Sequence, residues 1–376
     1  MKKIVYWSPV ISKIATFNAV ISSAKTLKTY SKDYEVSIIN TVGEYDELKN
    51  NDYDINIIDF FRTKKNYYGS GFWKTRISLL EIFLKNFFKL KKYLDKNNPD
   101  FLIIHLLTSL PLILLILFKF KTKFILRISG YPKMNFFRNI LWKIALRKIY
   151  CIISPTQKTS EFIKNLNFIE KEKIIPIYDP IISYRKINKL KKHEVKYQNY
   201  FVSIGRLTKQ KNLFLLLGAF KDLYNEKNLE EKLIIIGDGE LKEKIQQYIN
   251  LNNLTEKIIL LGYKKNVYKY LYNAKAFVLT SLWEDPGFVL IEAANCRTSL
   301  ISSDCKNGPI EFLKDKDNGY LFKSNSKADL KQKILEFKNS NEKNIKTKKF
   351  NALKESYKFS FIRHFINLNN ILNYEK

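Results

Sequence analysis

The chain has 376 residues, more than a single hydrophobic core usually organises, so we expect two domains of ordinary size. Hydrophobic residues make up 45% of the chain and aromatic residues 14%, which excludes a disordered protein. Its three cysteines exclude a disulfide scaffold, and they lack the spacing of a structural zinc site. The apolar stretch at the N-terminus is too short for a signal peptide, so we expect the chain to stay in the cytoplasm.

Positive charge is the most unusual property of the composition. The chain has 66 basic residues against 36 acidic ones, a net charge of +30, and the stretch 61–150 alone holds 19 basic and three acidic residues. The codon usage of an AT-rich genome would also favour lysine. The concentration in one stretch nevertheless favours an anionic partner, either nucleic acid or an anionic membrane surface.

Within this basic stretch, residues 77–94 alternate apolar and lysine positions at helical spacing. The pattern is typical both of a helix that lies on a membrane and of a surface helix that packs on a sheet, and the second explanation is favoured. Residues 101–120 are apolar enough to resemble a membrane span. We instead predict a strand, a turn and a helix, because His105 ends the first apolar run and Pro111 fits the first turn of a helix.

Short apolar strands alternate with helices through the first half of the chain. Continuous apolar runs are typical of strands buried on both faces, which predicts a parallel sheet covered by helices on each side. The predicted strands are Ile4–Tyr6, Tyr34–Ile39, Ile55–Asp59, Phe101–His105, Phe124–Ile128 and Ile149–Ile153, and the helices include Ile14–Tyr30, Ile77–Leu94 and Phe136–Ile149.

A second series of strands begins after the polar, lysine-rich run 183–199. Its predicted strands are Tyr200–Ile204, Leu233–Ile236, Ile258–Leu261, Ala276–Leu279 and Leu300–Ser302. We therefore predict an α/β protein of two Rossmann-like, doubly wound parallel-sheet domains that face a cleft. The predicted boundaries are a first domain at 1–182, a linker at 183–199, a second domain at 200–358, and a C-terminal helix at 359–376 that packs back toward the first domain.

The strand 200–204 ends in a motif suited to a diphosphate. Gly205 allows a sharp turn at the strand end, and Arg206 and Lys211 then project from the loop that follows. In open parallel sheets, ligands bind at the carboxyl ends of the strands. The guanidinium fork and the compact ammonium therefore lie where they can balance the charge of a diphosphate.

A second motif contains two glutamates separated by seven residues. Glu284 follows the strand 276–279, and Asp285 and Pro286 are typical of a helix N-cap and of the first helical residue. The helix is predicted to begin there and to run through Glu292, and its free N–H groups would favour an anion. Glu292 is expected to accept hydrogen bonds from a ribose diol, and Glu284 from a second hydroxyl-rich group.

Together these residues resemble the retaining glycosyltransferases of family four. The resemblance rests on Gly205-Arg206-Leu207, on Lys211-Asn212 and on the two glutamates, and it extends to the motifs Gly237–Glu240, Leu261–Tyr263, Ser303–Glu311 and Asn318–Leu321. It implies the two-Rossmann-domain fold called GT-B and an enzyme of the hexosyltransferase type that uses a nucleotide-sugar donor. The motif at 303–311 is similar to a loop of the polysaccharide-assembly branch, which implies bacterial O-antigen, lipopolysaccharide or capsule biosynthesis.

The resemblance also implies a role for each residue of the site. The catalytic residues would be Arg206, Lys211, Glu284 and His105. The two cations would stabilise the leaving diphosphate in place of a metal, and His105 would lie near the sugar. The implied donor-binding residues are Gly205, Arg206, Lys211, Tyr263, Glu284, Gly287, Phe288 and Glu292. No metal and no further cofactor are expected.

A partner is expected on each side of the reaction. The C-terminal domain would bind the donor, in particular a UDP-sugar, and the N-terminal domain a glycan or polyprenyl-diphosphate-linked acceptor. The basic N-terminal domain predicts contact with an anionic membrane surface, as a peripheral protein on the inner face of the cell membrane. Two alternatives remain, namely a sugar-nucleotide epimerase of the same architecture and a non-catalytic basic binder of membranes or nucleic acid. The sequence contains no nucleic-acid recognition module, so nucleic acid is not an expected partner.

Overall fold

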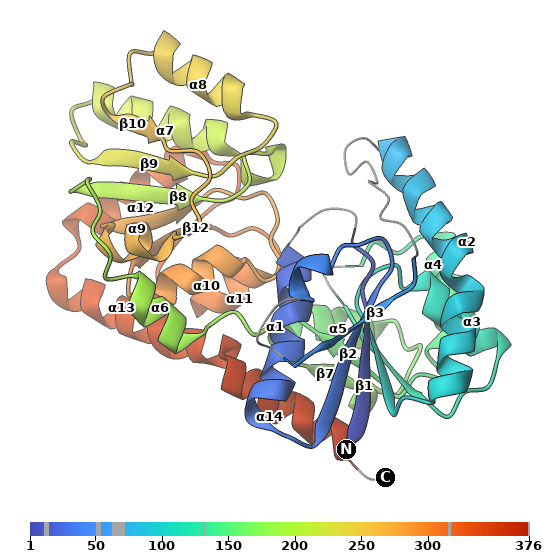
Figure 1. Ribbon diagram of the computed structural model, residues 1–376. Helices are drawn as coiled ribbons and strands as arrows, with labels where there is room; N and C mark the ends of the chain where they lie inside the picture. The colour runs from blue at the N-terminus through green and yellow to red at the C-terminus, as the bar shows by residue number, and fades with distance from the viewer. Residues whose placement is uncertain are drawn as a thin grey trace. The chain divides into compact units, whose positions relative to one another are not determined.

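The computed structural model describes residues 1–10, 15–49, 54–61, 72–128, 130, 132–314 and 317–374. The chain folds into two compact units, Met1–Pro180 with Phe361–Lys376 and Ile181–Ser360 (Figure 1). Each unit is built on a parallel sheet, so the prediction of an α/β protein with two doubly wound domains is confirmed. Residues 183–199, predicted as a linker, contain helix α6 (Tyr184–Leu190) and belong to the second unit.

The first unit is a seven-stranded parallel sheet with helices on both faces. Its elements are β1 (Lys2–Trp7), α1 (Ala15–Tyr30), β2 (Tyr34–Asn40), η1 (Asp46–Leu48), β3 (Asn56–Asp59), α2 (Phe72–Asn97), β4 (Phe101–Ile104), α3 (Ser109–Leu117), β5 (Lys123–Arg127), α4 (Phe136–Ala145), β6 (Cys151–Ser154), α5 (Gln157–Asn165), η2 (Lys171–Lys173), β7 (Ile174–Pro176) and α14 (Phe361–Leu372). The strand order is β3-β2-β1-β4-β5-β6-β7. The apolar segment at 101–120 divides into β4, a turn and α3 as predicted. No helix among the described residues is both long and apolar enough to cross a bilayer.

Alternate residues of β4 explain why its apolar run is continuous. Leu102 and Ile104 join one core, together with residues of α2, α3, α4 and α5. Phe101 and Ile103 point to the other face and join residues of α1 and α14. Both faces of the sheet are therefore buried, and α2 to α5 form one continuous helical layer.

A buried chain of hydrogen bonds attaches α14 to the first unit. His364 Nε2 lies 2.8 Å from Ser23 Oγ, which lies 2.9 Å from Tyr6 Oη, and His364 Nδ1 lies 2.9 Å from Tyr178 O. Burial lowers the pKa of His364 to about 4, so the ring is neutral at pH 7. Because a carbonyl only accepts, Nδ1 donates to Tyr178 and Nε2 accepts from Ser23. Residues more than 340 positions apart in sequence are thus joined in one core.

The second unit is a six-stranded parallel sheet in the order β10-β9-β8-β11-β12-β13. Its elements after α6 are β8 (Tyr200–Ile204), η3 (Lys209–Lys211), α7 (Leu213–Asn225), β9 (Lys232–Ile236), α8 (Lys242–Leu251), β10 (Ile258–Leu260), α9 (Tyr268–Asn273), β11 (Ala276–Leu279), α10 (Phe288–Asn295), β12 (Ser299–Ser303), α11 (Gly308–Leu313), β13 (Tyr320–Phe322), α12 (Lys327–Asn339), α13 (Glu342–Ser356) and η5 (Tyr357–Phe359). Helices α7, α8 and α12 share one core with the strands. The strand order reverses between β8 and β11, the position at which doubly wound sheets bind ligands.

Candidate functional site

The loop after β8 brings Lys211 back to the strand end. Its side chain lies against Gly205, where an added Cβ would be 2.9 Å from Lys211 Cε. Glycine at position 205 therefore provides the space that the lysine side chain occupies. Arg206, the next residue, is exposed.

Lys211 forms an ion pair with Glu284, and the two side chains are only 15% and 10% exposed. Ser281 Oγ donates to the same carboxylate oxygen at 2.7 Å. The backbone supports this arrangement, because Thr280 Oγ1 donates to Lys211 O at 2.8 Å and Leu282 N donates to Gln210 O at 2.9 Å. The loops that follow β8 and β11 are therefore joined around the Lys211–Glu284 pair.

A pocket lies where β8 and β11 end. Arg206, Lys211 and the backbone of Gly205 line it, together with Ser203, Ile204, Leu207, Leu213, Ile235, Leu279 and Thr280. The two cations share this pocket with apolar walls, which strengthen electrostatic contacts to an anion. The pocket thus has the charge and the position expected for a diphosphate site.

The motif at 237–240 supports the Arg206 loop through backbone contacts. Gly205 N donates to Ile236 O at 3.0 Å, and Leu207 N donates to Asp238 O at 2.9 Å. Gly237 has φ +148°, and a Cβ there would lie 1.8 Å from Gly205 O. The close approach of the two loops therefore requires glycine at position 237.

Helix α10 begins two residues later than the sequence predicted. Its N-cap is Gly287, with φ +92°, and Phe288 is the first helical residue. The prediction of Asp285 as N-cap and Pro286 as first residue is wrong, because the loop at 303–311 holds this segment outside the helix. Glu284 pairs with Asn307 in an isolated parallel bridge. A Cβ at Gly308 would lie 1.9 Å from Pro286 O. The residue that caps α10 is therefore a glycine and not an acidic residue.

Glu292 lies on α10 and contacts Tyr268 of α9, whose Oη donates to Glu292 Oε1 at 2.9 Å. Burial raises the pKa of Glu292 to about 7. Glu292 is not one of the described residues that line the pocket at the ends of β8 and β11. Tyr268 could not be predicted from the sequence, because its contact with Glu292 joins residues of two helices that are 24 positions apart.

We predict that Glu292→Gln stabilises the protein above pH 7. The folded state holds the proton of Glu292 more tightly than the unfolded chain, so the wild type loses stability as the pH rises from about 4.5 to about 7. At pH 8 the variant should be more stable than the wild type by up to about 3 kcal/mol in free energy of unfolding and should unfold at a higher temperature, whereas at pH 5 the difference should be much smaller. Thermal unfolding at both values tests this, with the exposed Glu256→Gln as control. An equal difference at pH 5 and pH 8 would contradict the assignment.

His105 follows β4 in the first unit and is 3% exposed. Its ring lies against that of Tyr6, with 5.9 Å between the centroids. Burial, reinforced by the charge of Arg127, lowers the pKa of His105 well below its usual value. The imidazole is therefore neutral at pH 7. Arg127 forms a buried ion pair with Asp179, which fixes the charge next to the histidine.

The remaining predicted donor-site residues lie at different depths. Tyr263, in the loop after β10, is 73% exposed, and Phe288 is partly buried at the start of α10. A Cβ at Gly287 would lie 3.5 Å from Glu284 Cβ, so this glycine borders the ion pair. Ser281 was missed from the sequence, although its position three residues before Glu284 is a local signal.

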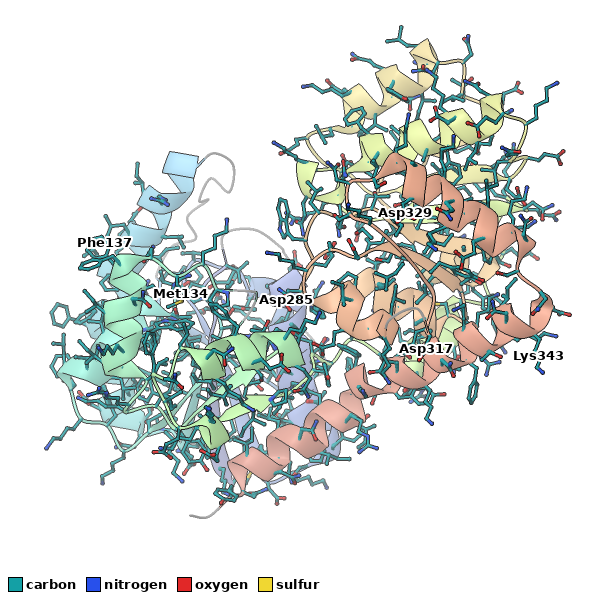
Figure 2. All side chains as sticks on the ribbon, turned by 180° about the vertical axis from the view of Figure 1, so that it is seen from behind. Met134, Phe137, Asp285, Asp317, Asp329 and Lys343 are labelled. Carbon is teal, nitrogen blue, oxygen red and sulfur yellow. The ribbon has the colours of Figure 1, made fainter. Side chains whose placement is uncertain are left out.

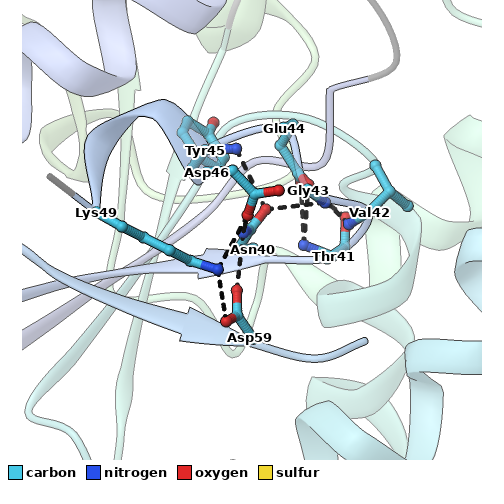
Figure 3. Close-up of polar contacts among 9 residues, drawn as sticks. All are labelled: Asn40, Thr41, Val42, Gly43, Glu44, Tyr45, Asp46, Lys49 and Asp59. Atoms are coloured by element: carbon cyan, nitrogen blue, oxygen red, sulfur yellow. Dashed lines mark hydrogen bonds and ion pairs between the residues drawn. The ribbon is translucent and has the colours of Figure 1, made fainter. Parts of the chain in front are cut away.

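A second polar cluster follows β2 in the first unit, and its side chains form hydrogen bonds and ion pairs with one another (Figure 3). The Asn40 amide donates to Asp46 Oδ1 at 2.9 Å and to Asp59 Oδ1 at 2.8 Å. Lys49 forms ion pairs with the same two carboxylates, and Glu44 accepts from backbone N–H groups of the turn. The carboxylates of the cluster are thus bound by N–H and ammonium groups of the same segment. We infer that the cluster has a structural role at the ends of β2 and β3.

Known proteins with similar chains identify the family. The family model described as glycosyl transferases group 1 matches residues 185–353. An uncharacterized glycosyltransferase of Methanocaldococcus jannaschii is 34% identical over 313 residues, which cover 76% of this chain and 73% of that protein. An α-1,4-N-acetyl-D-galactosaminyltransferase of Campylobacter jejuni, named for a glycan on PP-undecaprenol, is 28% identical over 334 residues, or 85% and 86% of the two chains.

The fold comparison agrees with the sequence comparison. The crystal structure of HepE from Anabaena in complex with UDP and glucose superimposes with a TM-score of 0.71 at 15% identity, over 98% of this chain and 99% of that one. The resemblance inferred from the motifs is thereby confirmed. The chain belongs to the glycosyl transferases of group 1 and is a glycosyltransferase with the two-domain GT-B fold.

Proposed function

We propose that this enzyme moves a sugar, with retention of configuration, from a UDP-sugar to a lipid-linked glycan in bacterial surface-polysaccharide assembly at the inner face of the membrane. The observation that carries the proposal is the pocket at the ends of β8 and β11, which is lined by Arg206 and by Lys211, the ion-pair partner of Glu284. The PP-undecaprenol in the name of one relative and the UDP bound to HepE support the acceptor and donor classes. Family membership favours transfer over the epimerase and over the basic binder.

In the proposed reaction, the acceptor oxygen bonds to the anomeric carbon on the face from which the diphosphate leaves. The bond between the anomeric carbon and the phosphate oxygen breaks, and its electron pair stays on the diphosphate. The proton of the acceptor hydroxyl passes to a phosphate oxygen. Arg206 and Lys211 stabilise the developing negative charge without a metal, and Glu284 accepts from hydroxyl groups of the sugar. Glu292 holds the ribose, and neutral His105 donates to or accepts from the sugar.

Product analysis with a panel of nucleotide sugars and an undecaprenyl-diphosphate glycan tests the proposal. We expect a product that is one sugar longer, with the anomeric configuration of the donor, in stoichiometric amount with released UDP. Mass spectrometry and proton NMR measure length and configuration. Conversion of the donor sugar in the absence of acceptor would instead identify an epimerase. An inverted linkage would overturn the proposed stereochemistry.

A further inference from the structure

The outer face of α2 exposes large apolar side chains in one stripe. Ile77, Leu80, Leu84 and Phe88 are between 59% and 72% exposed. Their spacing of three and four residues places them on one side of the helix. The opposite side carries Ile82, Leu90 and Leu94, which are fully buried. Helix α2 is therefore apolar on the face that points away from the sheet as well as on the face that packs against it.

The outer face of α4 repeats this pattern. Phe136, Phe137, Ile140 and Ile144 are between 46% and 81% exposed, whereas Trp142 is buried. Figure 2 shows Phe137 at the outer edge of the first unit, pointing away from it. Two adjacent phenylalanines at the start of a helix expose more apolar surface than isolated surface residues usually do.

The two stripes belong to one layer. Helices α2 and α4 both pack against α3, and all three contribute to the same core on one face of the sheet. Their outer faces therefore point to the same side of the first unit. In a parallel sheet with crossover helices, the helices begin at the carboxyl edge of the strands. The α2 stripe lies in the first two thirds of that helix, so the exposed apolar residues gather toward the edge where such sheets bind ligands.

Basic side chains border both stripes. Lys92 is exposed on α2, as is Lys85, which forms an ion pair with Glu81, and Lys143, Arg147 and Lys148 are exposed on or just after α4. Each base close to an anionic bilayer tightens binding about fivefold. An apolar stripe between bases is the arrangement of helices that lie in the headgroup region of a membrane. A second copy of this chain would bring the same bases face to face, which disfavours dimerisation through this surface.

We propose that the outer faces of α2 and α4 form a membrane-docking face for a bilayer with anionic headgroups. The eight apolar side chains enter the boundary between headgroups and acyl chains, and the flanking bases contact the phosphates. This gives the membrane association proposed above a specific surface. The docking face is independent of the donor site, because every residue in it belongs to the first unit.

Vesicle flotation with the full chain tests the docking face. The probes are vesicles of phosphatidylcholine alone and vesicles with about one third phosphatidylglycerol. We expect binding only to the anionic vesicles, weakened at high salt. Leu84→Ser with Phe137→Ser should reduce the partition coefficient at least about tenfold. The matched control is Leu251→Ser with Phe350→Ser, two side chains of the second unit that are 84% and 64% exposed, and it should bind like the wild type.

Equal binding of both double variants would overturn the proposal, as would wild-type binding that ignores lipid charge. Sedimentation equilibrium measures the oligomeric state independently. If the wild type were a dimer and Leu84→Ser with Phe137→Ser abolished it, the face would be an interface with a second copy of the chain and not a membrane-docking face. Transfer to a soluble acceptor analogue separates this inference from the proposed function. The Leu84 and Phe137 variant should keep that transfer and lose transfer to a lipid-linked acceptor in vesicles.

Discussion

Arg206→Ala is expected to reduce kcat about 100-fold to 1,000-fold while the protein keeps its thermal stability. The proposed role of Arg206 is to stabilise charge that develops on the leaving diphosphate, and the loss of one such electrostatic donor has an effect of this size. Arg206 is exposed, so its removal should leave the fold unchanged. Steady-state kinetics with release of UDP measure the loss. Lys209→Ala, an exposed lysine in the same turn, is the control and should stay within about twofold.

Lys211→Ala is expected to reduce kcat as strongly as Arg206→Ala. It also leaves the carboxylate of Glu284 without its ion-pair partner. Breaking one side of a shielded ion pair lowers stability. The double variant Lys211→Ala with Glu284→Gln removes the stranded charge and should recover the unfolding temperature without recovering activity. Near-native kcat in the Arg206 variant, or recovered activity in the double variant, would remove the diphosphate assignment.

Gly237→Ala is expected to lower the free energy of unfolding by at least about 3 kcal/mol. A Cβ at this position would lie 1.8 Å from Gly205 O, and φ is +148°, so the methyl group displaces the Arg206 loop and strains the backbone. Thermal unfolding followed by circular dichroism measures the change.

Gly262→Ala is the matched control for Gly237→Ala. Its φ of +68° is also positive but lies near the left-handed helical region, where the backbone cost of a side chain is smaller, and nothing lies within 4 Å of the added Cβ. It should cost about 1 kcal/mol. Equal destabilisation by the two variants would show that the contact with the Gly205 loop contributes nothing.

The periodicity of the sequence was sufficient to predict most of the architecture. Continuous apolar runs such as Phe101–Ile104 fill both faces of a sheet, so each run indicates a buried parallel strand without knowledge of its neighbours. The short strands β7 and β13 were missed. β7 ends in Pro176 and β13 has only three apolar residues, so neither provides the unbroken run of four, Ile258–Leu261, from which the equally short β10 was predicted.

The geometry of the candidate site could be predicted from the sequence where neighbouring residues determine it, and not where distant parts of the backbone determine it. Gly205, Arg206 and Lys211 lie within one turn, so their spacing in the sequence was enough to predict that they lie close together. The start of α10 depends instead on Gly308, whose backbone lies against Pro286 and holds that segment outside the helix. The partner of Glu292, Tyr268, comes from another helix, and only the packing of α9 on α10 brings it there.

The contact between Lys211 and Glu284 would also affect which anions the proposed diphosphate site accepts. An incoming anion has to displace a carboxylate that Ser281 already holds. Inorganic phosphate at pH 7 carries only one or two O–H groups that could donate to the released carboxylate, whereas the sugar of a nucleotide sugar supplies several hydroxyl groups. We therefore expect the proposed diphosphate site to prefer a ligand that carries both charge and sugar over the abundant free phosphate of a cell.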